Sequence, residues 1–357
     1  MNAEQMKIPE KHASPFARAV IVGMGQTGRM FYEQLLPVSG MDAIGIKRSG
    51  WADLEAHHPD LIIAATPNPA DEVLKKLAET VREGTTIILP QNGVSVIQVA
   101  EQIFPPEHRV HLVRASLLTP VSTDEDGRIR YRPEKKTISF APIHDDPNAA
   151  ERAAELFSLA GFRTRVYEDA RAMEITKLLL NTIGATSTVT GLTPLETFHD
   201  EELFSLEMHG LMDRLAVLHR AGKELINFPG YPYVKALDEL AGMLQHAPGV
   251  MREDMLPALA SLFRDRIASM IAGGRSNLPS ASFRSIRHGK KTEVRYYHQP
   301  FIHLAETNGG GCPLDESILE IVSGHEKGKL NLNEMDIPER RQLLLDTYRA
   351  HIHAEKA

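Results

Sequence analysis

The sequence contains a single cysteine, no long apolar run and no basic stretch, and each of these absences excludes a class of protein. Cys312 cannot form a disulfide within the chain, so nothing in the sequence calls for an oxidising compartment. No uninterrupted apolar run approaches the roughly 20 residues that a membrane-spanning helix needs. The first 18 residues carry scattered charges and lack the apolar core of a signal peptide. These features predict a cytoplasmic protein that does not associate with membranes.

The charged residues and the histidines argue against two kinds of binding site. The 357 residues include 40 Lys and Arg against 47 Asp and Glu, a formal net charge of −7, and no basic arm. Nucleic-acid-binding proteins gain affinity by neutralising phosphates, so this balance argues against a nucleic-acid partner. The 16 histidines include close pairs, but none of these pairs has further ligands at a spacing that suits zinc. No metal site is predicted.

The N-terminal half alternates short β-branched strands with amphipathic helices, a pattern that predicts parallel β-α-β units. The expected strands cover residues 17–23, 42–49, 61–67, 85–94 (a strand and its following turn), 108–118 and 163–168. The expected helices cover residues 29–40, 69–81, 95–104 and 148–161. Between them, residues 123–142 predict a hairpin, with Asp126-Gly127 as the turn signal before one of its strands.

After residue 168 the pattern changes to helical periodicity interrupted by Gly and Pro clusters, with no convincing strand. The sequence therefore divides into a polar N-terminal arm (1–18), an α/β domain (19–168) and a helical domain (169–335). A C-terminal helix (336–357) follows, and it begins at an Asp-x-Pro signal.

A glycine-rich turn follows the first expected strand and opens the first expected helix. Its residues are Gly23, Met24, Gly25, Gln26, Thr27 and Gly28, which match G-x-G-x-x-G. In this context the first glycine allows a tight turn, the second lets the backbone approach a pyrophosphate, and the third allows close helix–strand packing. The phosphates would then lie at the helix N-terminus. The motif predicts a dinucleotide cofactor, the alternative being a glycine-rich turn without a ligand.

The end of the second strand favours NADP over NAD. A carboxylate at this position would bind the ribose 2′-hydroxyl of NAD, whereas cations suit the 2′-phosphate of NADP. The sequence here is Lys47-Arg48-Ser49, which provides two cations and no carboxylate. NADPH/NADP is therefore the predicted cofactor, with Lys47 and Arg48 as its 2′-phosphate ligands. The alternative interpretation is a solvated Lys-Arg pair.

A second group of polar residues lies in the helical half. Lys177 and Asn181 are four residues apart and share one helix face within an apolar stretch, where desolvation would lower the pKa of the lysine and ease proton donation. Taken alone, Lys177 also fits a surface lysine with a buried stem. Far downstream, Glu293 follows a basic run.

Together these motifs resemble the ketopantoate reductase (2-dehydropantoate 2-reductase) family. The matching segments are the glycine turn, Gln91-Asn92-Gly93-Val94, the K-x-x-x-N helix from Lys177 to Asn181, and Arg287–Val294. The resemblance covers about residues 18 to 325 and implies an α/β Rossmann-like N-terminal domain followed by an all-helical C-terminal domain. It places the active site in the cleft between the two domains.

The resemblance implies an NADP-dependent oxidoreductase acting on CH-OH, which reduces a 2-oxo acid, by family default 2-dehydropantoate to pantoate. It assigns Lys177 as proton donor and Glu293 as a ligand of the cofactor ribose that also orients the lysine. Asn92 is expected near nicotinamide and substrate, and Asn181 is expected to bind substrate. The expected partner is a small-molecule 2-oxo acid, and a homodimer is left open.

Several positions depart from the family pattern and leave the substrate open. Ala185 replaces a second asparagine, and the family's P-S-M-x-Q-D stretch reads Pro279–Arg284, so either Ser280 or Ser282 is the expected substrate-binding serine. The turn after the third strand has no lysine, and residues 192–279 form an unusually long segment. A missing amide donor changes which substrate a pocket satisfies.

Two alternative functions remain open on the sequence alone. The first is an opine-type or other 2-hydroxy acid dehydrogenase with the same two-domain plan, in which Lys177 need not be the acid. The second is a non-catalytic dinucleotide-binding sensor of the same fold. The missing asparagine favours the sensor, whereas the retention of Lys177, Asn181 and Glu293 together opposes it.

Overall fold

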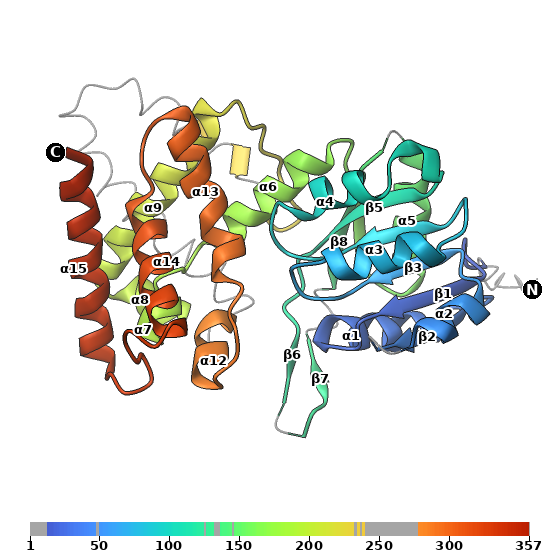
Figure 1. The fold of residues 1–357 in the computed structure, drawn as a ribbon, viewed down its shortest axis with the longest axis horizontal. Coiled ribbons are helices and arrows are strands. Elements are labelled where there is room, and N and C mark those ends of the chain that lie inside the picture. The colour runs from blue at the N-terminus through green and yellow to red at the C-terminus, as the bar shows by residue number, and fades with distance from the viewer. Residues whose placement is uncertain are drawn as a thin grey trace, which may run out of the picture. The chain divides into compact units, whose positions relative to one another are not determined.

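The computed structural model describes residues 13–47, 50–124, 126–131, 136–144, 146–231, 234–235, 238–239 and 278–356. These residues form two compact units (Figure 1). The first unit runs to Gln91 and continues over Val96–Ala170, and the second comprises Asn92–Ser95 and the chain from Arg171 onward. Arg48, residues 1–12 of the predicted arm and residues 240–277 of the long segment lie outside the described residues.

The first unit is built on a seven-stranded sheet with the order β2-β1-β3-β4-β5-β8-β9. Its strands are β1 (Arg18–Val22), β2 (Asp42–Ile46), β3 (Leu61–Ala64), β4 (Thr86–Leu89), β5 (His111–Leu117), β8 (Thr137–Pro142) and β9 (Arg163–Val166). The helices between them are α1 (Gln26–Leu35), α2 (Trp51–His57), α3 (Asp71–Thr80), α4 (Val96–Ile103) and α5 (Pro147–Leu159). The strands from β2 to β5 are parallel, which confirms the predicted Rossmann-like arrangement.

The order of the strands reverses at β1, which pairs with β2 on one side and with β3 on the other. Helices cover both faces of the sheet, so β3 and β4 are buried along their whole length and consist mainly of β-branched and other apolar residues. One face packs on α1 and α5, with Phe31 and Phe157 in edge-to-face contact at 5.3 Å. Ligands of such sheets bind at the carboxyl ends of the strands beside this reversal, where the glycine turn lies.

The predicted hairpin over residues 123–142 is correct only for its first part. Two short strands, β6 (Ser122–Thr123) and β7 (Ile129–Arg130), pair as a separate antiparallel ribbon that projects from the sheet (Figure 1). The rest of the segment forms β8, which pairs antiparallel with β5 and parallel with β9. The side chains of Ile138 and Phe140 in β8 are buried in the core beside α5, and this burial draws the strand into the main sheet.

The packed part of the chain begins before the predicted end of the polar arm at residue 18. Phe16 is only 2% exposed and belongs to the core of the first unit. The backbone N–H groups of Ala17 and Arg18 both donate to the Asp60 carboxylate at 2.8 Å. These contacts fix the chain at the start of β1. The sequence also gave no indication of the short helix α2.

The described part of the second unit is helical, apart from one isolated bridge between Phe228 and Tyr231. Its helices are α6 (Ala170–Asn181), α7 (Ser187–Thr190), α8 (Pro194–His199), α9 (Glu201–Arg220), α12 (Ala281–Arg287), α13 (Val294–Asn308), α14 (Pro313–Glu326) and α15 (Ile337–Lys356). Residues of α6, α9 and α13 share one apolar core, and a second core joins α7 and α9 with α14 and α15. The predicted C-terminal helix is thus α15, which packs within this unit. No helix among the described residues has the length and apolar character to cross a membrane.

Candidate functional site

The glycine turn after β1 has the geometry that its three glycines predict. Gly23 has φ +97°, and an added Cβ there would lie 2.8 Å from the carbonyl oxygen of Ala65 at the end of β3. At Gly28 an added Cβ would overlap the carbonyl oxygen of Gly23. At Gly25 an added Cβ would meet no atom within 4 Å. A side chain at Gly23 or Gly28 would therefore collide with neighbouring backbone atoms. The space beside the Cα of Gly25, by contrast, is open.

This open position lies at the N-terminus of α1. Gly25 is the N-cap residue of α1, and no side chain caps the helix there, so the first turn keeps its unpaired backbone N–H groups. Unpaired N–H groups and the positive end of the helix dipole favour an anion. The turn therefore fits a dinucleotide pyrophosphate. Within the first unit, the Met24 side chain lies against Gly45 of β2, which has no side chain to obstruct it.

Of the two predicted 2′-phosphate ligands, the structure describes Lys47. It follows β2 directly and its side chain is exposed. The β2 strand is the neighbour of β1, so Lys47 and the glycine turn occupy the same edge of the sheet. Arg48 lies outside the described residues.

The Gln91-Asn92-Gly93-Val94 turn follows β4 and is held by a buried arginine that the sequence analysis did not identify. Arg114 of β5 is 2% exposed, and its guanidinium donates to the carbonyl oxygens of Leu89 and Gln91, both at 2.5 Å. The Gln91 side chain donates at 2.6 Å to the carbonyl of Ala64, at the end of β3. Charge-assisted bonds of this length are strong, so the backbone that leads into Asn92 is rigidly placed.

Asn92 belongs to the second unit together with the three residues that follow it. Gly93 has φ +94°, and Val94 packs against the core formed by α6, α9 and α13. The Asn181 side chain at the end of α6 donates to Oδ1 of Asn92 at 3.3 Å. The structure therefore brings together the two asparagines predicted to bind substrate, although 89 residues separate them along the chain.

Lys177 lies one turn before Asn181 on α6 and is 8% exposed. The same helix carries Glu174, which is 5% exposed and three residues before Lys177, so the two side chains occupy neighbouring positions on the helix. The helix is anchored by Ile175, Leu178 and Leu179, which are buried in the core of the second unit. Lys177 is thus a buried lysine.

Glu293 and Ser280 each precede a helix. Glu293 occupies the N-cap position of α13, and its Oε2 accepts a 2.9 Å hydrogen bond from the hydroxyl of Tyr297. Ser280 caps α12, its Oγ accepting from the backbone N–H of Phe283 at 3.0 Å. The Thr188 hydroxyl lies 3.2 Å from the same oxygen.

Ala185, which stands where the family has a second asparagine, is 5% exposed and belongs to the apolar core around α7 and α14. Ser282 is half-buried on α12.

Cys312 is completely buried at the start of α14, where burial raises the pKa of its thiol. In the described part of the chain, no three His, Cys, Asp or Glu side chains gather as metal ligands would.

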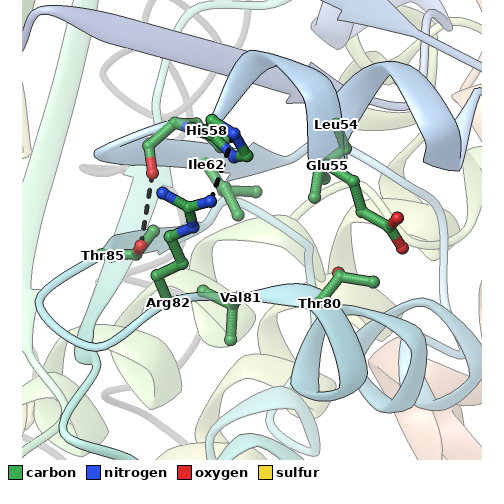
Figure 2. A pocket seen from close by; sticks show the side chains of 9 residues that line it. Leu54, Glu55, His58, Ile62, Thr80, Val81, Arg82 and Thr85 are labelled. Atoms are coloured by element: carbon green, nitrogen blue, oxygen red, sulfur yellow. Dashed lines mark hydrogen bonds between the residues drawn. The ribbon is translucent and has the colours of Figure 1, made fainter.

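The first unit also contains a small pocket, which Figure 2 shows from close by; none of the glycine-turn residues line it. It opens where β3 and β4 begin, which is the opposite edge of the parallel sheet from the carboxyl ends. Arg82 donates to the ring of His58 at 3.2 Å across it, and the Thr85 hydroxyl donates to the carbonyl of Pro59 at 3.3 Å (Figure 2). Dinucleotides bind sheets of this kind at the carboxyl ends of the strands, on the other edge.

A Rossmann-like unit with an open glycine turn, joined to a helical unit, defines a class of two-unit nucleotide-binding proteins. Comparison with known proteins narrows this class. Residues 46–144 match the family model described as ketopantoate reductase PanE/ApbA. The 2-dehydropantoate 2-reductase of Aquifex aeolicus (strain VF5) is 23% identical over 335 residues, which cover 86% of this chain and 96% of that protein. These matches confirm the resemblance to the ketopantoate reductase family that the sequence motifs predicted.

Solved structures confirm the fold over nearly the whole of their own length. D-mandelate dehydrogenase in a ternary structure with NADH and anilino(oxo)acetate has a TM-score of 0.66 at 14% identity, covering 88% of this chain and 99% of that one. A dimeric ketopantoate reductase from Staphylococcus aureus has a TM-score of 0.62 at 16% identity, covering 88% of this chain and all of that one.

Proposed function

We propose that this chain reduces a 2-oxo acid to the 2-hydroxy acid with NADPH, and that Lys177 is the proton donor. The observation that carries the proposal is the grouping on α6: a buried lysine one helical turn from Asn181, which is hydrogen-bonded to Asn92. A buried ammonium group beside two amide side chains is suited to a substrate that develops an oxyanion. The family match supports the same reaction class.

The chemistry follows from the charges that develop during reduction. The reduced nicotinamide, when bound, supplies the hydride that forms the new C–H bond at the carbonyl carbon. The carbonyl oxygen then gains negative charge, and Nζ of Lys177 stabilises it and transfers a proton to it. The product is a 2-hydroxy acid, and the neutral lysine regains its proton from solvent before the next turnover.

The remaining predicted residues have roles that suit their positions. Asn181 and Asn92 offer amide donors and acceptors for the substrate, and Asn92 is also the proposed neighbour of the nicotinamide. Glu293 is proposed as a ligand of the cofactor ribose, with Tyr297 fixing its carboxylate. Between the two serines, Ser282 is the better candidate for the substrate, because Ser280 already caps α12 through its hydroxyl oxygen. A homodimer, as in the Staphylococcus aureus protein, is the proposed assembly.

The proposal is tested by following NADPH oxidation with a panel of 2-oxo acids that differ in size and charge at C3, with ketopantoate included. We expect turnover with at least one branched or aromatic 2-oxo acid. Tight NADPH binding without turnover of any acid would instead favour a nucleotide-binding sensor of the same fold. Ketopantoate is the default substrate of the family, but Ala185 removes one amide donor, which changes the set of acids that the site accepts.

Replacing Gly25 by alanine is expected to weaken NADPH binding by about 5- to 150-fold, which corresponds to a cost of about 1–3 kcal/mol from steric overlap. The added methyl group would occupy the open face where the pyrophosphate approaches the backbone. The free protein should lose at most about 1 kcal/mol of stability, because the methyl group meets no atom and only the N-cap preference is changed. Calorimetric titration and thermal unfolding measure the two effects, and unchanged affinity would contradict the assignment of the turn.

Replacing Lys47 and Arg48 together by alanine is expected to weaken NADPH binding by about 2–4 kcal/mol, taking each charge-assisted hydrogen bond at about 1.5–3 kcal/mol with incomplete additivity. NADH lacks the 2′-phosphate, so its binding should barely change. Fluorescence titration with both cofactors gives the comparison. An equal loss for both would show that these side chains do not bind the 2′-phosphate.

A further inference from the structure

The second unit contains a buried ionic cluster made of Glu207, Arg214, His298 and Asp315. All four side chains are at most 3% exposed. Glu207 and Arg214 lie on α9, His298 lies on α13 and Asp315 lies on α14. The proposed reaction gives none of them a chemical role. Burying several charged groups is costly, so their arrangement calls for an explanation.

Within the cluster, Arg214 and His298 bind the same carboxylate. Nε of Arg214 donates to both oxygens of Asp315, at 2.8 and 3.1 Å. Nδ1 of His298 lies 2.7 Å from Oδ1 of Asp315, and because a carboxylate only accepts, this nitrogen carries the hydrogen. Burial acts to lower the pKa of Arg214, but the carboxylates of Asp315 and Glu207 outweigh it, so the pKa is raised and the group stays charged.

Glu207 and Arg214 also form hydrogen bonds with the backbone that follows α6. Glu207 accepts from the N–H of Thr186 at 2.6 Å and from the N–H of Gly184 at 3.1 Å. Arg214 donates through Nη1 to the carbonyl of Thr182 at 3.3 Å. Burial raises the pKa of Glu207, and the nearby Arg214 and these backbone N–H groups oppose that rise. The turn that links α6 to α7 is therefore held at three backbone atoms.

The cluster thus connects two elements that carry proposed active-site residues. Thr182, which it binds, follows Asn181 directly, and Lys177 is one turn earlier on the same helix. At the other end, His298 is one residue beyond Tyr297, whose hydroxyl binds Glu293. From α6 to α13 the chain of contacts consists of charge-assisted hydrogen bonds among buried groups. Such bonds permit little displacement of one helix relative to the other.

We infer that the buried ionic cluster is a positioning device for the proposed reaction, which fixes the end of α6, and with it Lys177 and Asn181, relative to the start of α13 and Glu293. The inference rests on the proposed function. Glu207 and His298 are its two outer members: Glu207 sets the path of the backbone after Asn181, and His298 holds α13 through Asp315. A displacement of about 1 Å in a reacting group costs about 100-fold in rate.

The inference is tested with three variants in the full-length protein. His298→Leu removes the hydrogen bond to Asp315, whereas His298→Asn retains it, because the amide nitrogen takes the place of Nδ1. His303→Leu is the matched control, since His303 lies on the same helix with its side chain 74% exposed. We expect His298→Leu to lower kcat for the 2-oxo acid by about 10- to 100-fold. His298→Asn and His303→Leu should keep at least half of the wild-type kcat and bind NADPH with a Kd within twofold of the wild-type value.

A merely structural role would give a different pattern. In that case His298→Leu would lower the unfolding temperature and the yield, but each folded molecule would keep its kcat, and this result would overturn the inference. A kcat for His298→Asn as low as that of His298→Leu would also overturn the inference. Glu207→Gln adds a measurement that does not depend on turnover. The glutamine side chain keeps only one acceptor oxygen, so hydrogen exchange at the amide of Gly184 or of Thr186 should accelerate at least tenfold. Unchanged exchange at both amides would show that Glu207 does not hold the turn. If the wild-type protein reduces no 2-oxo acid, the proposed function fails. The exchange result still shows whether the buried ionic cluster holds the turn after α6.

Discussion

Replacing Lys177 by alanine is expected to lower kcat for the 2-oxo acid by about 10²- to 10⁴-fold, the usual contribution of a positioned general acid. The side chain is 8% exposed, so water does not readily take its place as proton donor. NADPH binding should change little, because the glycine turn and Lys47 lie in the other unit. Steady-state NADPH oxidation and a cofactor titration measure the two effects.

Two further substitutions separate proton donation from charge. Lys177→Arg keeps a cation but cannot release a proton near neutral pH, so we expect it to restore little of the lost kcat. Lys327→Ala, at an exposed position after α14, should leave kcat unchanged. Substantial recovery in Lys177→Arg would show that the ammonium acts only as a charge. A Lys177→Ala protein with wild-type kcat would remove Lys177 from the mechanism.

Local patterns in the sequence predict much of the first unit. Short β-branched runs such as those around Val20 and Ile62 become buried strands, because helices cover both faces of a parallel sheet. The glycine turn is also predictable, because each glycine answers a steric demand within a few residues of itself or at the neighbouring strand. Features of this kind depend on the local chain, so one sequence is enough to recognise them.

Features that depend on distant residues were not predictable in this way. β8 pairs with β5 and does not complete the hairpin, because Ile138 and Phe140 reach a core that other elements build. Asn92 belongs to the second unit, although strands of the first unit surround it in sequence, because Val94 packs on α6 and its neighbours. Hydrophobic periodicity does not contain this information.

In the candidate site, too, some residues can be recognised from the local sequence and others only from the packing of distant residues. Lys177 and Asn181 are visible in the sequence because a K-x-x-x-N spacing puts both on one helix face. Arg114 was missed because a lone arginine in an apolar strand gives no sign that its guanidinium will bind the carbonyls of Leu89 and Gln91. Glu207 looks like an ordinary helix-surface residue in sequence. Only the packing of other parts of the second unit against α9 shows it to be buried.

Replacing Arg214 by methionine is expected to destabilise the folded protein by about 3–5 kcal/mol, because it leaves the carboxylates of Asp315 and Glu207 buried without their cation. At about 2–4 °C per kcal/mol for a unit of this size, the unfolding temperature of the second unit should fall by roughly 10 °C. Differential scanning calorimetry measures the shift.

The matched control is Arg349→Met on α15. Arg349 also bonds a carboxylate, that of Asp346 at 3.2 Å, but its side chain is 55% exposed. Solvent screens such a pair, so its loss should cost less than about 1 kcal/mol. Adding Asp315→Asn to Arg214→Met should recover part of the stability, because one of the two unpaired anions is then neutral. Similar unfolding temperatures for Arg214→Met and Arg349→Met would show that the buried cation is not needed to balance these carboxylates, and the cluster would lose its energetic basis.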